Sequence, residues 1–100
     1  MFEQLKIITD IIDHPFALYQ EQTCIFESKI DNSDVLTAFT KNFWDASKPD
    51  ILTLNHFRGL FFPSIKFLTT EATYLFILVI SEKEFSHWSK EQQTFFSEKF

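Results

Sequence analysis

The residues that could perform chemistry in this chain are few and widely spaced. A haem or metal site on a helix would need histidines about three or four residues apart, and His14, His56 and His87 do not have that spacing. Cys24 is the only cysteine, which excludes an internal disulfide and a cysteine-based zinc site. We therefore expect no metal ligands, and we expect each histidine to be an ordinary surface or core residue.

The candidates for catalysis are equally sparse. Cys24 and His56 could form a nucleophile pair, but Cys24 lies in an apolar segment with no catalytic signature, where a lone cysteine usually acts as a small buried hydrophobe. Glu82 and Glu84 lie in a polar tract, which indicates solvated loop charges rather than general acid–base catalysis. With Gly59 as its only glycine, the chain has no phosphate-cradling loop. We expect no catalytic residues, no cofactor and no enzymatic activity.

Arg58 and Gly59 are the only arginine and the only glycine, and they lie between two apolar segments. The arginine could meet an anionic ligand, or a carboxylate of a partner protein, at the rim of a cleft. A surface bend between two strands explains the same pair more simply. Both interpretations stay open at this point.

Composition limits the elements that can position these residues. A chain of 100 residues, 45% of them hydrophobic, can form one domain around one core. The net charge of −5, without a basic cluster, disfavours direct nucleic-acid binding. No secretory leader precedes the first helix, and the longest apolar run is too short to span a membrane, so we expect a cytoplasmic protein. The apolar end at Phe100 indicates the N-terminal part of a longer protein.

Hydrophobic periodicity predicts alternating helices and strands. The run over residues 74–80 is apolar at every position, so this strand must be covered on both faces and lie at the centre of the sheet. Pro63 predicts a break, because proline cannot donate to a strand ladder, and the residues after it alternate as in a half-exposed strand. The predicted helices cover residues 2–12, 33–44 and 88–100, and the predicted strands cover residues 16–20, 23–29, 51–57, 65–67 and 74–80.

These elements predict an α+β fold with an antiparallel sheet of about five strands flanked by helices, in the spatial order 2-1-5-4-3. The helix over residues 33–44 would cover one face and the two terminal helices the other. The arrangement resembles the PAS and GAF sensory folds and, more loosely, the profilin-like roadblock and longin modules. Residues 11–19 running into residues 24–28, with residues 74–80 near the end, resemble the small sensor head that precedes the DNA-binding region of some AraC-type bacterial transcription regulators.

The resemblance implies a non-enzymatic sensory domain that binds a small ligand between sheet and helix and controls an attached output domain. Strand parity suggests which residues would line that space, with Arg58 at its rim, although the same side chains could simply fill a solid core. The candidate pocket residues are Phe16, Leu18, Phe26, Phe39, Phe43, Leu54, Arg58 and Phe76. Fourteen phenylalanines fit either an aromatic pocket or a biased base composition.

The terminal helices would expose aromatic faces that a domain of this size can hardly bury alone. We therefore expect a homodimer formed through these helices, with a small molecule as the possible ligand and no membrane partner. The alternative function is a roadblock-like or longin-like interaction module, which would have a solid core and no ligand pocket.

Overall fold

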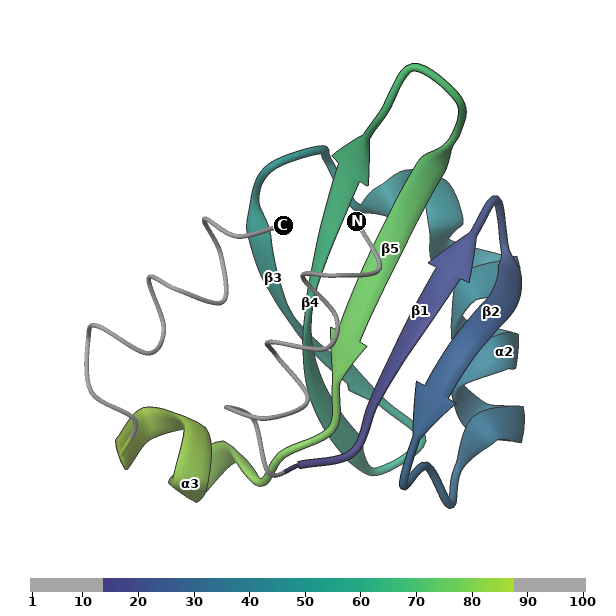
Figure 1. The fold of residues 1–100 in the computed structure, drawn as a ribbon. Helices are drawn as coiled ribbons and strands as arrows, with labels where there is room; N and C mark the ends of the chain where they lie inside the picture. The colour runs from purple at the N-terminus through teal and green to yellow at the C-terminus, as the bar shows by residue number, and fades with distance from the viewer. Residues whose placement is uncertain (1–13, 88–100) are drawn as a thin grey trace.

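Five antiparallel strands in the order β2-β1-β5-β4-β3 form one sheet, and helix α2 covers one of its faces (Figure 1). The computed structural model describes residues 14–87. The elements are β1 (Phe16–Gln20), β2 (Thr23–Ser28), α2 (Ser33–Phe43), the 3₁₀ helix η1 (Trp44–Ala46), β3 (Leu52–Phe57), β4 (Leu60–Leu68), β5 (Thr73–Leu78) and α3 (Glu82–His87). The predicted α+β class and strand order are confirmed. The helices predicted over residues 2–12 and 88–100 lie outside the described residues.

Strand β5 lies at the centre of the sheet, as its apolar run predicts. It pairs with β1 through Leu18↔Phe76 and with β4 through Ile65↔Phe76. Side chains from both of its faces pack into hydrophobic clusters, so every residue from 74 to 78 is buried. The strand ends at Leu78, earlier than predicted, and the next residue, Val79, donates its backbone N–H to the Pro15 carbonyl at 2.8 Å.

Helix α2 begins at Ser33, inside a run of residues that favour helix N-caps, Asp31-Asn32-Ser33-Asp34. The Asn32 carbonyl accepts the N–H of Leu36 at 3.1 Å, and Asp34 places a negative charge in the first turn, which suits the positive end of the helix dipole. Leu36 and Phe39, three positions apart, face the sheet and are buried. The predicted helix is confirmed to within one residue, because Trp44 begins η1 instead of extending α2.

Helix α3 corrects the prediction that Glu82 and Glu84 lie in a loop. The Ser81 hydroxyl accepts the backbone N–H of Glu84 at 3.0 Å, and the Ser81 carbonyl accepts that of Phe85 at 2.9 Å. This serine therefore caps the first turn of a short helix. Both glutamates are exposed on it, while Phe85 is buried against the sheet.

Strand β4 runs through Pro63 without the predicted break. Pro63 faces Leu54 in β3, whereas pairing between β4 and β5 starts only at Ser64↔Ile77. The proline thus lies before the part of β4 that pairs with β5, where its missing N–H costs no ladder bond. The predicted half-exposed pattern after Pro63 is also wrong, because Ser64 and Lys66 are buried beside Ile65.

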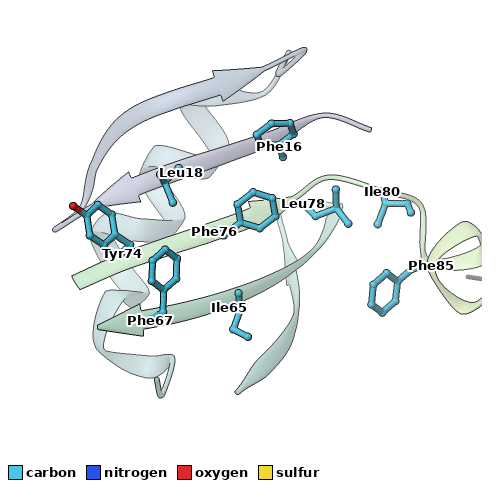
Figure 2. Close-up of a cluster of buried hydrophobic side chains, with 9 residues drawn as sticks. All are labelled: Phe16, Leu18, Ile65, Phe67, Tyr74, Phe76, Leu78, Ile80 and Phe85. Atoms are coloured by element: carbon cyan, nitrogen blue, oxygen red, sulfur yellow. The ribbon is translucent and has the colours of Figure 1, made fainter. Parts of the chain in front are cut away.

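Two hydrophobic clusters lie on opposite faces of the sheet. The far-side cluster, drawn in Figure 2, consists of Phe16, Leu18, Ile65, Phe67, Tyr74, Phe76, Leu78, Ile80 and Phe85. The α2-side cluster consists of Ala17, Tyr19, Leu36, Phe39, Trp44, Phe62, Leu75 and Ile77. Adjacent strand residues fall in different clusters, because successive side chains of a strand point to opposite faces.

Candidate functional site

The sheet separates the residues that we predicted to line one pocket. Phe16, Leu18 and Phe76 belong to the far-side cluster, on the face opposite α2, and Phe26 stacks on Phe16 with a ring separation of 5.7 Å. Their predicted orientation toward α2 is therefore wrong. A strand that is buried on both faces has no polar position to mark which parity faces the helix, and an error of one residue moves the whole set to the other face.

Phe39 and Phe43 on α2 do face the sheet, but the middle of the interface between α2 and the sheet is occupied by protein side chains. The side chains that fill it are each at most 1% exposed: Ala17, Tyr19, Leu36, Phe62, Leu75 and Ile77. Tyr19 also turns its hydroxyl toward the Thr37 hydroxyl, 3.3 Å away, so its polar end has a partner inside the protein. The centre of this interface is thus packed as a solid core.

An aromatic recess remains where the end of α2 passes over strand β3. We define it by the rings of Phe39, Phe43 and Phe57, whose centres lie 5.5 to 5.8 Å apart, together with Ser47 and Asn55. Its cavity volume is about 260 Å³, and it is open to solvent. Of the predicted pocket residues, Phe39, Phe43 and Leu54 border it. Phe57 was missed, although it lies at the end of a predicted strand beside Arg58.

Asn55 lies at the base of the recess, and its side-chain amide forms hydrogen bonds within the sheet. Its side-chain amide donates to the Phe62 carbonyl at 2.9 Å and to the Ser64 hydroxyl at 2.8 Å, and only 8% of the residue is exposed. Both amide hydrogens therefore have acceptors within the protein. What the recess presents to a partner is mainly the exposed part of its aromatic rings.

Strand β3 forms the edge of the sheet next to this recess (Figure 1). Leu54 on it is 53% exposed, Ile51 directly before it is 54% exposed, and Phe43 in the recess is 42% exposed. The strand has no lysine, arginine, aspartate or glutamate, and its register with β4 is unbroken from Leu52 to Phe57. Proteins usually protect edge strands with charges, prolines or bulges, and β3 has none of these.

The opposite edge, strand β2, has two of these protections. Its pairing with β1 shifts between Leu18 and Tyr19, so that Ile25 forms an irregularity in the strand, and Glu27 places a charge on it. The bulge and the charge both oppose the addition of another strand. The two edges of the sheet therefore differ in how they can pair with other chains.

The turn after β3 determines which main-chain groups face the open edge. Arg58 and Gly59 have φ angles of +52° and +79°, which are typical of a two-residue type I′ hairpin turn. Counted from such a turn, the facing residue pairs of an antiparallel ladder alternate between hydrogen-bonded and non-hydrogen-bonded pairs. The main-chain N–H and C=O groups of Leu52, Leu54 and His56 therefore point away from β4. The surface-bend interpretation of Arg58 is confirmed, and its guanidinium lies 5.0 Å from the Phe57 ring centre.

His14 and His56 each lie close to a glutamate side chain of helix α3. His14 Nδ1 lies 3.7 Å from a Glu84 carboxylate oxygen, and His56 Nε2 lies 3.5 Å from one of Glu82. These two contacts connect α3 to residues next to β1 and on β3. Within residues 14–87, no group of three or more His, Cys, Asp or Glu side chains could hold a metal ion.

Cys24 is exposed on β2, which corrects its prediction as a buried hydrophobe. Partial burial of the thiol raises its pKa, and the neighbouring Glu27 carboxylate raises that pKa further, which disfavours the reactive thiolate. His56 is on the opposite edge of the sheet, four strand spacings of about 4.8 Å each from β2. The two residues thus cannot act as a nucleophile and base pair.

Comparison with known proteins identifies no relative of this chain. No protein-family model matches it, and neither the curated proteins nor the solved structures include a match. Among the described residues, no helix is long and apolar enough to cross a bilayer. The candidate site is therefore described from the structure alone: it consists of edge strand β3, which has no charge, proline or bulge, and the aromatic recess beside it.

Proposed function

We propose that this domain is a protein–protein interaction module, and that its working surface consists of the β3 edge and the aromatic recess. One observation supports this most directly: the strand without charge, bulge or proline is the one that carries exposed Leu54 and lies next to exposed Phe43. An extended segment of a partner can add to such an edge through main-chain hydrogen bonds, while a neighbouring pocket provides specificity for a side chain.

In this proposal the domain acts as a regulatory head in a cytoplasmic protein and controls an attached output domain by bringing partners together. This role agrees with the filled interface between α2 and the sheet, where a ligand-binding domain of this type would need space. It also agrees with the alternative that the strand order suggests, a roadblock-like or longin-like interaction module.

A small-molecule sensor is the second candidate, and the aromatic lining of the recess is the observation that favours it. Its volume of about 260 Å³ is below the roughly 300–1,000 Å³ of typical ligand pockets. Its buried amide, on Asn55, already donates to Phe62 and Ser64. Native mass spectrometry of the purified chain separates the candidates, because a sensor retains a defined small-molecule mass and an interaction module does not.

Site-specific photo-crosslinking in the native cell tests the proposed surface. A photoreactive phenylalanine analogue at position 54 should form discrete protein adducts, because Leu54 is exposed on the working edge. The matched control is position 25 on β2, where Ile25 is 37% exposed but the edge is bulged and charged. Adducts that are absent at position 54, or equally abundant at both positions, would contradict the proposal.

A further inference from the structure

The segment that connects α2 to β3, residues 44–50, forms part of the border of the aromatic recess. Ala46, in η1, and Ser47, directly after it, line the recess together with residues of α2 and β3. The regular hydrogen bonding of a helix and of a sheet fixes α2 and β3, whereas the connecting segment contains only the short 3₁₀ helix η1. The contacts that hold residues 44–50 in place therefore affect the shape of the recess directly.

One end of this segment contacts the side chain of Lys66 in β4. Lys66 faces Leu75 of β5, whose side chain belongs to the α2-side cluster, so the lysine side chain points to the same face of the sheet. Its ammonium donates a hydrogen bond to the Trp44 carbonyl and lies 4.7 Å from the centre of the Trp44 ring. Both residues are buried, so these contacts are made largely out of water.

The other end of the segment contacts the main chain of the same lysine. Strand β3 pairs with β4 as far as Leu52↔Ile65, so Lys66 is the first residue of β4 beyond that pairing. Pro49 forms an isolated bridge with Lys66, and the Asp50 N–H donates to the Lys66 carbonyl at 2.7 Å. Lys66 thus contacts residues at both ends of the segment 44–50.

From these observations we infer that Lys66 is the positioning residue of the aromatic recess, because it holds both ends of residues 44–50 and thereby keeps Ala46 and Ser47 at the border of the recess. Lys66 does not line the recess itself, so it acts through these residues and not by contact with a partner. This inference rests on the proposed function, since a partner side chain that enters the recess needs its border in one fixed arrangement.

Two variants of neighbouring β4 residues separate this role from general stability. Lys66→Met keeps a long apolar side chain and removes the ammonium, so the Trp44 carbonyl loses its donor, while the main-chain carbonyl of residue 66 remains available to Asp50. Ile65→Val is the matched control, because its side chain belongs to the far-side cluster and its truncation weakens the core on the opposite face. Thermal unfolding shows that both variants are folded and compares their losses of stability.

Fluorine NMR of the full chain tests the positioning directly. A trifluoromethyl-phenylalanine at position 43 reports on the recess, and the same label at position 26, on β2, is the reference, since Phe43 and Phe26 are 42% and 38% exposed. Lys66→Met should change the chemical shift or line width at position 43 and leave position 26 unchanged, whereas Ile65→Val should leave position 43 unchanged. An unchanged signal at position 43 in Lys66→Met, or an equal change there in Ile65→Val, would overturn the inference.

Photo-crosslinking at position 54 tests the consequence for a partner, because Leu54 borders the recess. Lys66→Met should lower the yield of protein adducts at this position by about three- to tenfold, since the recess loses its fixed border. Ile65→Val should keep the yield within about twofold of wild type. An equal loss of adducts in both variants would show a general effect of stability and would overturn the inference.

The failure of this inference differs from the failure of the proposed function. Adducts at position 54 that are equally abundant in wild type and Lys66→Met overturn the role of Lys66 and retain the interaction module. A wild-type chain that forms no adducts at position 54, while the fluorine signal at position 43 changes in Lys66→Met, overturns the proposed function and retains Lys66 as the residue that positions the recess. The absence of both effects would overturn both.

Discussion

The Lys66 ammonium donates a hydrogen bond to the backbone carbonyl of Trp44 and lies 4.7 Å from the centre of the Trp44 ring. Lysine side chains stabilise the C-terminal ends of helical segments in this way, by binding the last carbonyls. The contact ties the junction between α2 and η1 to strand β4, next to the aromatic recess. Burial lowers the pKa of Lys66, and the carboxylates of Asp45 and Glu21 oppose that change.

Substitution Lys66→Met should lower the free energy of unfolding by about 1–2 kcal/mol at neutral pH, because the Trp44 carbonyl loses its donor. The pH dependence has a definite sign. Since the folded-state pKa of Lys66 lies below its ordinary value of 10.5, the unfolded chain binds more protons between the two values, and wild-type stability gains from rising pH there. Urea unfolding should show the gap between wild type and Lys66→Met widening toward alkaline pH. A gap that narrows would contradict the assignment.

Substitution Asn55→Ala should lower the free energy of unfolding by about 2 kcal/mol, since it removes two hydrogen bonds from a buried amide. Ser64→Ala removes only one of them and should cost about 1 kcal/mol. The double variant should cost less than the sum, with a coupling of about 1 kcal/mol in a double-mutant cycle. Strict additivity of the two changes would show that Asn55 and Ser64 do not interact.

Truncation of phenylalanines should distinguish the core from the proposed surface. Phe76→Ala empties a fully buried position and should lower the free energy of unfolding by about 3–5 kcal/mol. Phe43→Ala acts on a ring that is 42% exposed, and we expect a loss of about 1 kcal/mol or less, together with weaker association at the β3 edge. Chemical unfolding and the yield of crosslinked adducts at position 54 provide the two readouts. A large stability loss in Phe43→Ala would assign this ring to the core instead.

The reactivity of Cys24 should report its electrostatic surroundings. Its raised pKa predicts slow alkylation by iodoacetamide at neutral pH, with a rate that increases as the pH rises through that pKa. Glu27→Gln removes one of the causes and should move the midpoint of the pH–rate profile downward. Glu71→Gln, on the loop between β4 and β5, is the control and should leave the profile unchanged. An unchanged profile in Glu27→Gln would show that burial alone raises the pKa.

Much of the fold can be predicted from local patterns. The apolar run that contains β5 predicts a central strand, and the N-cap residues at 31–34, followed by the apolar face of residues 35–43, predict α2 to within one residue. The observed strand order places one hairpin on each side of the central β5, β1–β2 on one side and β3–β4 on the other. Pro63 shows where local rules fail, since its effect depends on where pairing with β5 begins.

The candidate site could be predicted only in part. Phe39, Phe43 and Leu54 were identified and border the recess, whereas Phe57 was not. The assignment of Phe16 and Phe76 to the α2 face was wrong. In a strand that is buried on both faces, the sequence does not show which of the two alternating sets of side chains points toward the helix.

Within residues 14–87, the sequence by itself determined α2, most of the strands and the burial of one strand on both faces, because hydrophobic periodicity and helix-start signals are local properties of the chain; it did not determine α3 or the continuity of β4 through Pro63. Only the tertiary structure decided which of the alternating strand side chains face α2, which edge strand has no charge, proline or bulge, and that an aromatic recess lies beside that strand. These features depend on contacts between segments far apart in the chain, such as Phe39 with Phe57 and Lys66 with Trp44, and no local pattern encodes their geometry.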